Sequence, residues 1–226
     1  MRNTNTTAPT TTTTGISPSA GPPPDDYSWV LGGPSESVFA RPAGWRGRLA
    51  GRLMIWMNRQ DEVADHIDVR SGQTVLEVGY GPGGLIRLLA ERTEAAKIIG
   101  VDPSAGMRAA ATRRNRVAVR AGRVDLRLGR ADRTGLPDRA VDRVVTVNNV
   151  AIWPDLDAGV TELHRVVRPG GTVTIAWHGG TTPPRHARPL ILPSSVLARV
   201  ERALRARFTD VRRAQLPTLD VFTATS

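Results

Sequence analysis

The residue types best suited to chemistry lie in one short stretch, Val75-Leu-Glu-Val-Gly-Tyr-Gly-Pro-Gly-Gly84. An apolar run suited to a β-strand leads into closely spaced glycines, and an apolar-periodic segment follows over residues 85–90. This succession predicts a strand, a tight turn and a helix. Glycines can adopt positive φ and let the backbone approach a ligand, while the first N–H groups of the helix point into the turn. The stretch therefore predicts a ligand-binding turn.

Glu77 is a charged residue near the end of this otherwise apolar strand. A buried charge is costly without a polar partner, so we expect Glu77 to have one. The glycine pattern Gly79-x-Gly81-x-x-Gly84 satisfies the fingerprint of dinucleotide-binding folds. The same glycines also fit a turn in an ordinary α/β domain that binds no ligand. Residues further along the chain have to decide between these interpretations.

Two acidic residues follow predicted strands downstream. The predicted strand 97–101 begins at Lys97 and continues as an unbroken apolar run. Asp102 follows this strand, about twenty residues after the glycine turn. An acid at that place can accept hydrogen bonds from both ribose hydroxyls of an adenosine ligand; it could equally cap the next helix, and the two roles are compatible. Asp132 follows the predicted strand 124–128, where it could accept from the exocyclic amine of adenine or occupy an ordinary turn.

A general base would have to come from residues near the ends of the strands, and the candidates are Tyr80, Asn149, Trp153 and His178. A histidine such as His178 can accept a proton near neutral pH, although an exposed loop histidine is the alternative. Tyr80 and Trp153 could pack against an apolar acceptor or close the ligand pocket. His164 falls in a helix with an apolar face and is interpreted as structural.

The composition narrows the possible chemistry. The chain has 226 residues, no cysteine and four scattered histidines, so we expect no disulfide, no cysteine nucleophile and no metal site. No apolar run approaches the ~20 residues of a membrane span, and no secretion signal is visible, so a cytoplasmic location is expected. The net charge of +10 invites a nucleic-acid partner, but the arginines are spread along the chain and not gathered in one block, which makes nucleic acid an unfavoured partner.

The chain divides into three predicted segments. Residues 1–35 are rich in Thr and Pro and are expected to be a disordered tail. Residues 36–68 are expected to form a helical lid, with helices over about 45–57 and 59–68. Its basic amphipathic pattern could also suit a membrane surface, but packing over a ligand cleft is favoured because a catalytic-type domain follows at once. Residues 69–226 are expected to be that domain.

Strands and helices alternate through the predicted domain, which is the pattern of a parallel α/β sheet. The expected strands are 73–78, 97–101, 124–128, 141–147, 172–177, 211–216 and 219–225. The expected helices are 84–93, 104–118, 156–167 and 195–208. Only Pro217-Thr218 separates the last two strands, so they should be antiparallel neighbours.

Five stretches in order resemble the motifs of the class I S-adenosylmethionine (SAM)-dependent methyltransferases: residues 77–83, 101–107, 129–137, 141–148 and 162–171. The resemblance covers about residues 60–226 and is greatest to the small-molecule, type 11 subgroup that includes the ubiquinone and menaquinone C-methyltransferases. It implies a Rossmann-like sheet of seven mostly parallel strands, in the order 3-2-1-4-5-7-6 with strand seven antiparallel, and helices on both faces. A dehydrogenase is disfavoured, because only one helix and a closing hairpin follow strand five.

The resemblance also implies a set of cofactor contacts. Glu77 would lie near the SAM amino group, Asp102 would hold the ribose diol, and Met107 would lie near the adenine. Asn148 would contact the methionine moiety. The residues that the resemblance places around the cofactor are Glu77, Gly79, Tyr80, Gly81, Gly83, Asp102, Pro103, Met107, Ala131, Asp132 and Asn148.

The expected reaction is an in-line SN2 methyl transfer from SAM to a small molecule. Compounds of secondary metabolism are among the expected acceptors. Asn148-Asn-Val-Ala151 departs from the Asn/Asp-Pro-Pro-aromatic motif of enzymes that methylate planar exocyclic amines. No RNA-binding module is recognisable, and the methylated atom is not readable. Two alternatives stay open: an RNA methyltransferase that uses the arginine-rich surface, and a SAM-binding protein without turnover.

Overall fold

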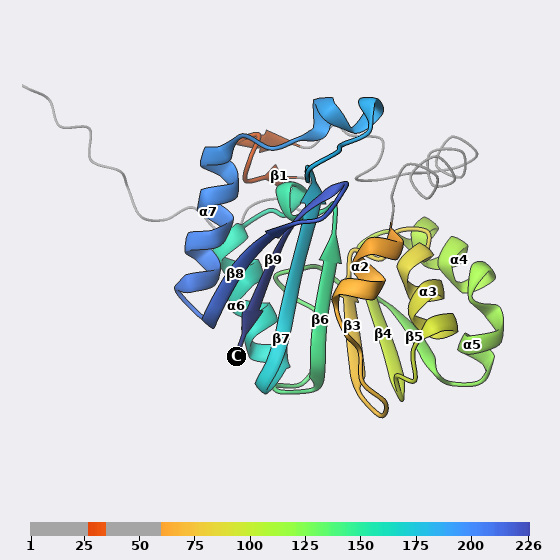
Figure 1. Ribbon diagram of the computed structural model, residues 1–226. Helices are drawn as coiled ribbons and strands as arrows, with labels where there is room; N and C mark the ends of the chain where they lie inside the picture. The colour runs from red at the N-terminus through yellow and green to blue at the C-terminus, as the bar shows by residue number, and fades with distance from the viewer. Residues whose placement is uncertain (1–26, 35–59) are drawn as a thin grey trace, which may run out of the picture.

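The computed structural model describes residues 27–34 and 60–226. The predicted helix over 45–57, most of the predicted lid and most of the predicted tail therefore lie outside the described residues. A seven-stranded sheet in the order β5-β4-β3-β6-β7-β9-β8 forms the centre of the molecule (Figure 1). Its strands are β3 (Thr74–Val78), β4 (Lys97–Asp102), β5 (Val124–Leu128), β6 (Val141–Val147), β7 (Val167–His178), β8 (Thr209–Gln215) and β9 (Leu219–Thr225).

The pairing confirms the predicted sheet. The five strands β5, β4, β3, β6 and β7 are mutually parallel, and β9 runs antiparallel to both β7 and β8. In the numbering of the sequence analysis this is the order 3-2-1-4-5-7-6. Crossover connections bring all the carboxyl ends of the parallel strands to one edge of the sheet. The turns that carry the predicted site residues therefore meet at that edge.

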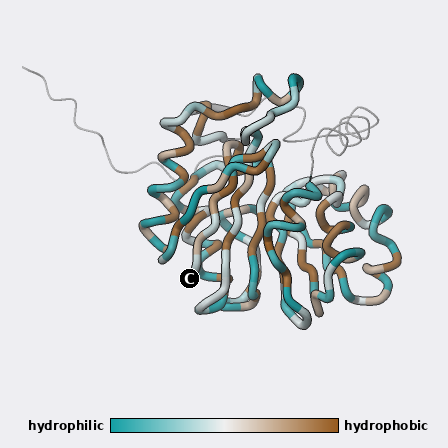
Figure 2. Tube along the Cα trace, viewed as in Figure 1, coloured by the Kyte–Doolittle hydropathy of each residue, from teal (hydrophilic) through white to brown (hydrophobic). Residues whose placement is uncertain are grey.

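Helices cover both faces of the sheet (Figure 1). The apolar cluster on one face combines side chains of the sheet with those of α2 (Gln60–His66), α3 (Gly84–Arg92) and α4 (Ala105–Arg114). The cluster on the other face includes side chains of α6 (Leu156–Val166) and α7 (Ser194–Arg205). Because the central strands are covered on both faces, they carry continuous apolar runs, and Figure 2 shows apolar residues following them. No helix in the described part of the chain is long and apolar enough to cross a bilayer.

Two elements differ from their predicted bounds. The helix expected over 104–118 is interrupted at Asn115 and continues as α5 (Arg116–Arg120), because the Asn115 side chain donates to the backbone oxygens of Gly83 and Ala111. Strand five begins earlier than residue 172: β7 starts at Val167, which pairs with Val141, and a register irregularity separates this pair from the next. The ends of the other strands and helices agree with prediction to within about three residues.

A short hairpin occupies part of the predicted tail. Residues Tyr27–Ser28 (β1) pair antiparallel with Gly33–Pro34 (β2), and Gly32 turns the chain at φ 64°. The hairpin packs on the 3-10 turn η1 (Val150–Ile152), which follows β6. Residues 27–34 thus belong to the folded domain, although their neighbours in the sequence are low in complexity.

Candidate cofactor site and active site

The glycine turn between β3 and α3 has the backbone geometry that only glycine tolerates well. Gly79, Gly81 and Gly83 have φ values of 72°, 51° and 77°. The Gly79 N–H donates to the Val101 oxygen at 2.8 Å, which ties the turn to the end of the neighbouring strand. A Cβ atom on Gly79 would lie 2.1 Å from the side-chain nitrogen of Asn149. The positive φ of Gly79 and its closeness to Asn149 therefore both require glycine at position 79.

Glu77 is buried beside this turn with an exposed fraction of 1%. Its Oε2 atom has no hydrogen-bond partner among the described residues. Burial, with a smaller contribution from the charge of Asp102, raises the pKa of Glu77 to about 8. A buried acceptor without a partner is costly unless a ligand donates to it. A cationic donor would form this hydrogen bond and stabilise the ionised carboxylate.

Asp102 joins the ends of β3 and β4. Its Oδ2 accepts from the Gly81 N–H at 2.9 Å and its Oδ1 accepts from the Ser104 N–H at 2.8 Å. Burial raises the pKa of Asp102 to about 6, against the opposing effect of these two hydrogen bonds. The N-cap of α4 is Ser104, whose hydroxyl oxygen accepts from the N–H of Met107. Ser104 therefore caps α4, while Asp102 binds the glycine turn through one oxygen and the start of the loop after β4 through the other.

The loop after β5 carries the residues expected to contact adenine. Ala131 is buried, while the carboxylate of Asp132 accepts two hydrogen bonds from the Arg130 guanidinium, at 2.9 and 2.8 Å. The pairing of Asp132 with Arg130 stabilises the turn that contains both residues. It keeps further lone pairs that could still accept from an amine.

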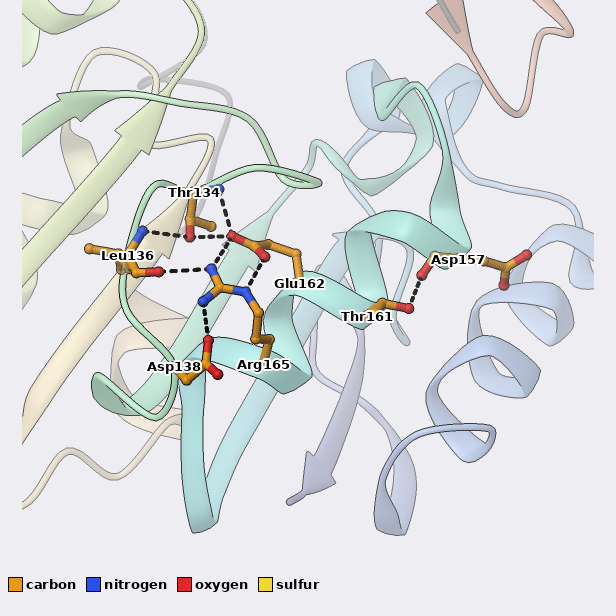
Figure 3. Close-up of polar contacts among 7 residues, drawn as sticks. All are labelled: Thr134, Leu136, Asp138, Asp157, Thr161, Glu162 and Arg165. Atoms are coloured by element: carbon orange, nitrogen blue, oxygen red, sulfur yellow. Dashed lines mark hydrogen bonds and ion pairs between the residues drawn. The ribbon is translucent and has the colours of Figure 1, made fainter. Parts of the chain in front are cut away.

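A partly buried polar cluster attaches this loop to α6 (Figure 3). Glu162 accepts from both the N–H and the hydroxyl of Thr134, at 2.8 and 2.6 Å. Arg165 donates to both oxygens of Glu162, and also to Asp138 and to the Leu136 oxygen. Burial disfavours the charged form of Glu162, but the hydrogen bonds from Arg165 and Thr134 outweigh it and lower the pKa of Glu162. The cluster fixes residues 134–138 and hence the end of the loop after β5.

The turn after β6 is organised by one amide side chain. Asn149 donates to the Val78 oxygen at 2.7 Å and accepts from the Thr146 hydroxyl at 2.5 Å and the Trp153 indole at 2.8 Å. Asn148, just before it, adopts a left-handed conformation with φ 56° and donates its N–H to the Ala176 oxygen. Since the amide of Asn149 is engaged with protein atoms, this geometry favours a positioning role over the catalytic role expected for it.

The three other candidate catalytic side chains are buried. The Tyr80 hydroxyl donates to the Arg127 oxygen, and its ring lies against Gly100, where a Cβ atom would come within 2.6 Å of it. The Trp153 ring lies against Gly159 in the same manner. His178, at the end of β7, is 8% exposed, and burial together with the nearby His186 lowers its pKa to about 4. His178 is therefore neutral at pH 7.

Known proteins share the fold and part of the sequence of this chain. A family model described as a methyltransferase domain matches residues 75–171. The crystal structure of a SAM-dependent methyltransferase from Aquifex aeolicus superimposes with a TM-score of 0.58 and 17% identity, covering 76% of this chain and 96% of that one. The uncharacterized methyltransferase YdaC of Bacillus subtilis is 31% identical over 141 residues, which cover 62% of this chain and 73% of YdaC. This chain belongs to the class I SAM-dependent methyltransferases.

A further relative is the demethylmenaquinone methyltransferase of Thermus thermophilus, 30% identical over 125 residues, which cover 55% of this methyltransferase and 54% of that protein. The chain thus spans about half the length of this relative. SAM is the cofactor of the family, and the residues present fit it. The unpartnered Glu77 oxygen suits the SAM ammonium, and the glycine turn and Asp102 suit the ribose. In the described residues of the methyltransferase, no cluster of three or more acidic or histidine side chains could hold a metal ion.

Reasoning from the sequence missed two groups that shape this site. The Glu162, Arg165 and Thr134 cluster was not expected, because its partners lie 28 residues apart and carry no local periodic signal. The only hint was a Glu and an Arg one helical turn apart on α6, which can share a face. The contacts of the N-terminal hairpin with η1 were also missed, since a Thr/Pro-rich surrounding obscures two short strands.

Proposed function

We propose that this methyltransferase transfers the methyl group of SAM to a small-molecule acceptor. The observation that carries the proposal is the buried Glu77, one oxygen of which has no partner within residues 27–34 and 60–226. This oxygen lies beside a glycine turn that Asp102 holds through the Gly81 N–H. We expect Glu77 to accept from the SAM ammonium and Asp102 to hold the ribose. The adenine would lie near Met107, Ala131 and Asp132, and the methionine moiety near Asn148.

When bound, SAM supplies a methyl group on a positively charged sulfonium that an acceptor nucleophile can displace in line. The protein then contributes mainly by alignment and by exclusion of water. Neutral His178 could accept a hydrogen bond from the acceptor, but a pKa of about 4 makes it a weak general base at pH 7. We therefore propose an acceptor whose nucleophilic atom needs no strong base, such as a phenolate, a carboxylate or a stabilised carbanion.

A small acceptor is supported by the connection between β7 and α7. It consists of residues 179–193 and contains only the 3-10 segment η2 (Arg185–Leu190). This short connection adds no domain to the described part of the chain. Compounds of secondary metabolism that carry acidic hydroxyl or carboxyl groups are the first acceptors to test.

The first test is calorimetric titration of the full chain with SAM and, separately, with NADH. We expect micromolar SAM binding, no NADH binding, and loss of SAM binding in Asp102→Ala. Asp65→Ala is the matched control, because the Asp65 carboxylate is 76% exposed on α2. Retention of SAM affinity in Asp102→Ala would contradict the assignment of the ribose site.

The second test measures S-adenosylhomocysteine release with a panel of small phenols, carboxylates and quinols, and with total tRNA. Turnover on a small compound would support the proposal. Turnover on tRNA alone would replace it with the RNA alternative. SAM binding without turnover on any of these compounds would favour a SAM-binding protein that does not transfer methyl groups.

A further inference from the structure

The N-terminal hairpin, residues 27–34, makes directional contacts with the turn that follows β6. The Ser28 hydroxyl donates to the Ala151 oxygen at 2.8 Å, and the Trp29 indole donates to the Val150 oxygen at 2.7 Å. The Trp29 backbone N–H donates to the Trp153 oxygen at 3.1 Å. Ser28 has no exposed surface. Two adjacent residues of the hairpin thus satisfy three backbone oxygens of one turn more than 120 residues away.

The same turn is hydrogen-bonded to the cofactor site. The Trp153 indole donates to the side-chain oxygen of Asn149, and the side-chain nitrogen of Asn149 donates to the Val78 oxygen. Val78 directly precedes Gly79, the first residue of the glycine turn. A continuous series of hydrogen bonds therefore runs from Trp29 through η1, Trp153 and Asn149 to the glycine turn.

We propose that Ser28 and Trp29 are positioning residues of the SAM site. They fix the η1 turn, and through Trp153 and Asn149 this turn holds the glycine turn in the conformation that receives SAM. The N-terminal hairpin is then part of the cofactor site, although it precedes the segment that matches the family model, residues 75–171.

The local geometry explains why this turn needs external support. Val150 and Ala151 are buried, with exposed fractions of 1% and 6%. Without the hairpin, the Ala151 oxygen would lose the Ser28 hydroxyl, and the Val150 oxygen would keep only the Trp153 N–H at 3.4 Å. A buried acceptor that loses its donor is costly. Asn148, immediately before the turn, adopts φ 56°, a left-handed conformation that asparagine accepts more readily than most residues. Support from the hairpin pre-organises this corner before the ligand arrives, which reduces the cost of binding.

The inference rests on the family cofactor and not on the proposed acceptor, so it can be tested without knowing the substrate. The test measures the dissociation constant of SAM by calorimetry, together with the melting temperature, for Trp29→Phe and Trp153→Phe in the full chain. Each change keeps an aromatic ring and removes one indole N–H. We expect each to raise the dissociation constant about fivefold, the effect of one hydrogen bond.

Leu31→Ala is the matched control, because its side chain lies in the same hairpin and the residue is 67% exposed. We expect its SAM affinity to stay within about twofold of wild type. Because Trp29 and Trp153 act in one series of contacts, the double variant should lose less affinity than the product of the two single effects. Independent, multiplying effects would overturn the proposed coupling.

A role restricted to stability gives a different result. The melting temperature of Trp29→Phe would then fall while the folded protein bound SAM within twofold of wild type, and the proposal would be wrong. If Trp29→Phe does not fold, Ser28→Ala removes a single donor and serves as the milder variant, with the same expected weakening of SAM binding. Failure of every acceptor in the turnover assay, with these affinity changes present, would contradict the proposed function alone.

Discussion

At the scale of the residue, the most informative side chain is Glu77. Its carboxyl group is buried on the face of the sheet covered by α2 and α3, because Glu77 lies two residues after Val75 on β3 and shares that residue's face. Burial raises its pKa to about 8, so the group is largely protonated at pH 7 in the absence of SAM. A ligand ammonium placed beside it would favour the charged form and expel the proton.

We therefore expect SAM binding at pH 7 to release a proton. The dissociation constant should decrease as the pH rises towards 8 and level off above it. Calorimetric titrations in phosphate and in Tris should give different heats of binding. The difference should equal the number of protons released multiplied by the difference between the ionisation enthalpies of the two buffers. In Glu77→Gln, which cannot ionise, the two heats should agree. Equal heats in both buffers for the wild type would contradict the placement of the ammonium at Glu77.

The same pKa has a consequence for stability without ligand. The folded-state pKa of about 8 exceeds the ordinary value of 4.5, so the folded state holds a proton that the unfolded state releases between these values. The contribution of Glu77 to the unfolding free energy is thus fully present below pH 4.5 and declines as the pH rises to 8, by up to about 1.4 kcal/mol per pH unit. Urea unfolding of wild type and Glu77→Gln across this range should show the two curves diverging with pH.

At the scale of the element, the loops at the carboxyl edge of the sheet are fixed by side chains from distant elements. Asp102 on β4 fixes the glycine turn, Asn149 fixes the corner between β3 and β6, and Glu162 on α6 fixes the loop after β5 (Figure 3). Each of these polar groups is buried and hydrogen-bonded, so each specifies one loop conformation. The site is therefore built by pairs of elements and not by any single one.

Glu162→Gln should lower the unfolding free energy at pH 7 by about 1–2 kcal/mol, because Arg165 loses the more buried of its two carboxylate partners and keeps only the exposed Asp138. The pKa of Glu162 is lowered, so the stabilising effect of its charge is present above pH 4.5 and disappears as the pH falls through the folded-state pKa. Urea unfolding at pH 7 and pH 3 should show the difference between wild type and variant shrinking at the lower pH.

Glu201→Gln provides the control for Glu162→Gln. Glu201 pairs with Arg205 one turn along α7, and both side chains have more exposed surface than Glu162. We expect a loss of less than about 0.5 kcal/mol. Equal losses in the two variants would show that the contacts of Glu162 with Thr134 add nothing beyond an exposed ion pair.

At the scale of the whole molecule, the apolar core extends well beyond the residues proposed to bind the cofactor. The apolar clusters on both faces of the sheet reach as far as β9, while the cofactor residues gather at the ends of β3, β4 and β6. Phe222 on β9 is 2% exposed and lies between β7 and β8, away from the glycine turn in the order of strands. Removing it should affect folding without altering the site.

Phe222→Ala should lower the unfolding free energy by about 3–5 kcal/mol through lost burial and the remaining cavity. The folded fraction should still bind SAM with an affinity within twofold of wild type, measured by calorimetry at low temperature. Val117→Ala, at a site that is 76% exposed, should change stability by less than about 0.5 kcal/mol. A loss below 1 kcal/mol in Phe222→Ala would mean that β9 contributes little to the core.

The sequence by itself determined the strands of the sheet and the glycine turn between β3 and α3. One apolar run ends at Val78, just before a glycine, and another is followed by Asp102. Such runs are local patterns that predict buried strands of a parallel sheet. The conformations of Gly79, Gly81 and Gly83 follow from residue type, because glycine alone accepts positive φ without strain. The strand order followed from the resemblance of five motifs and was confirmed by the strand pairing.

Only the tertiary structure decided which side chains support that turn. Asn149 looked like a residue of the reaction, yet its amide bonds to Val78 and Trp153, and Tyr80 lies against Gly100 inside the sheet. Glu162 reaches Thr134, and Trp29 reaches Val150, across long separations in the chain. Such contacts depend on where folding brings two segments together in space, and neither periodicity nor spacing along the chain encodes that position.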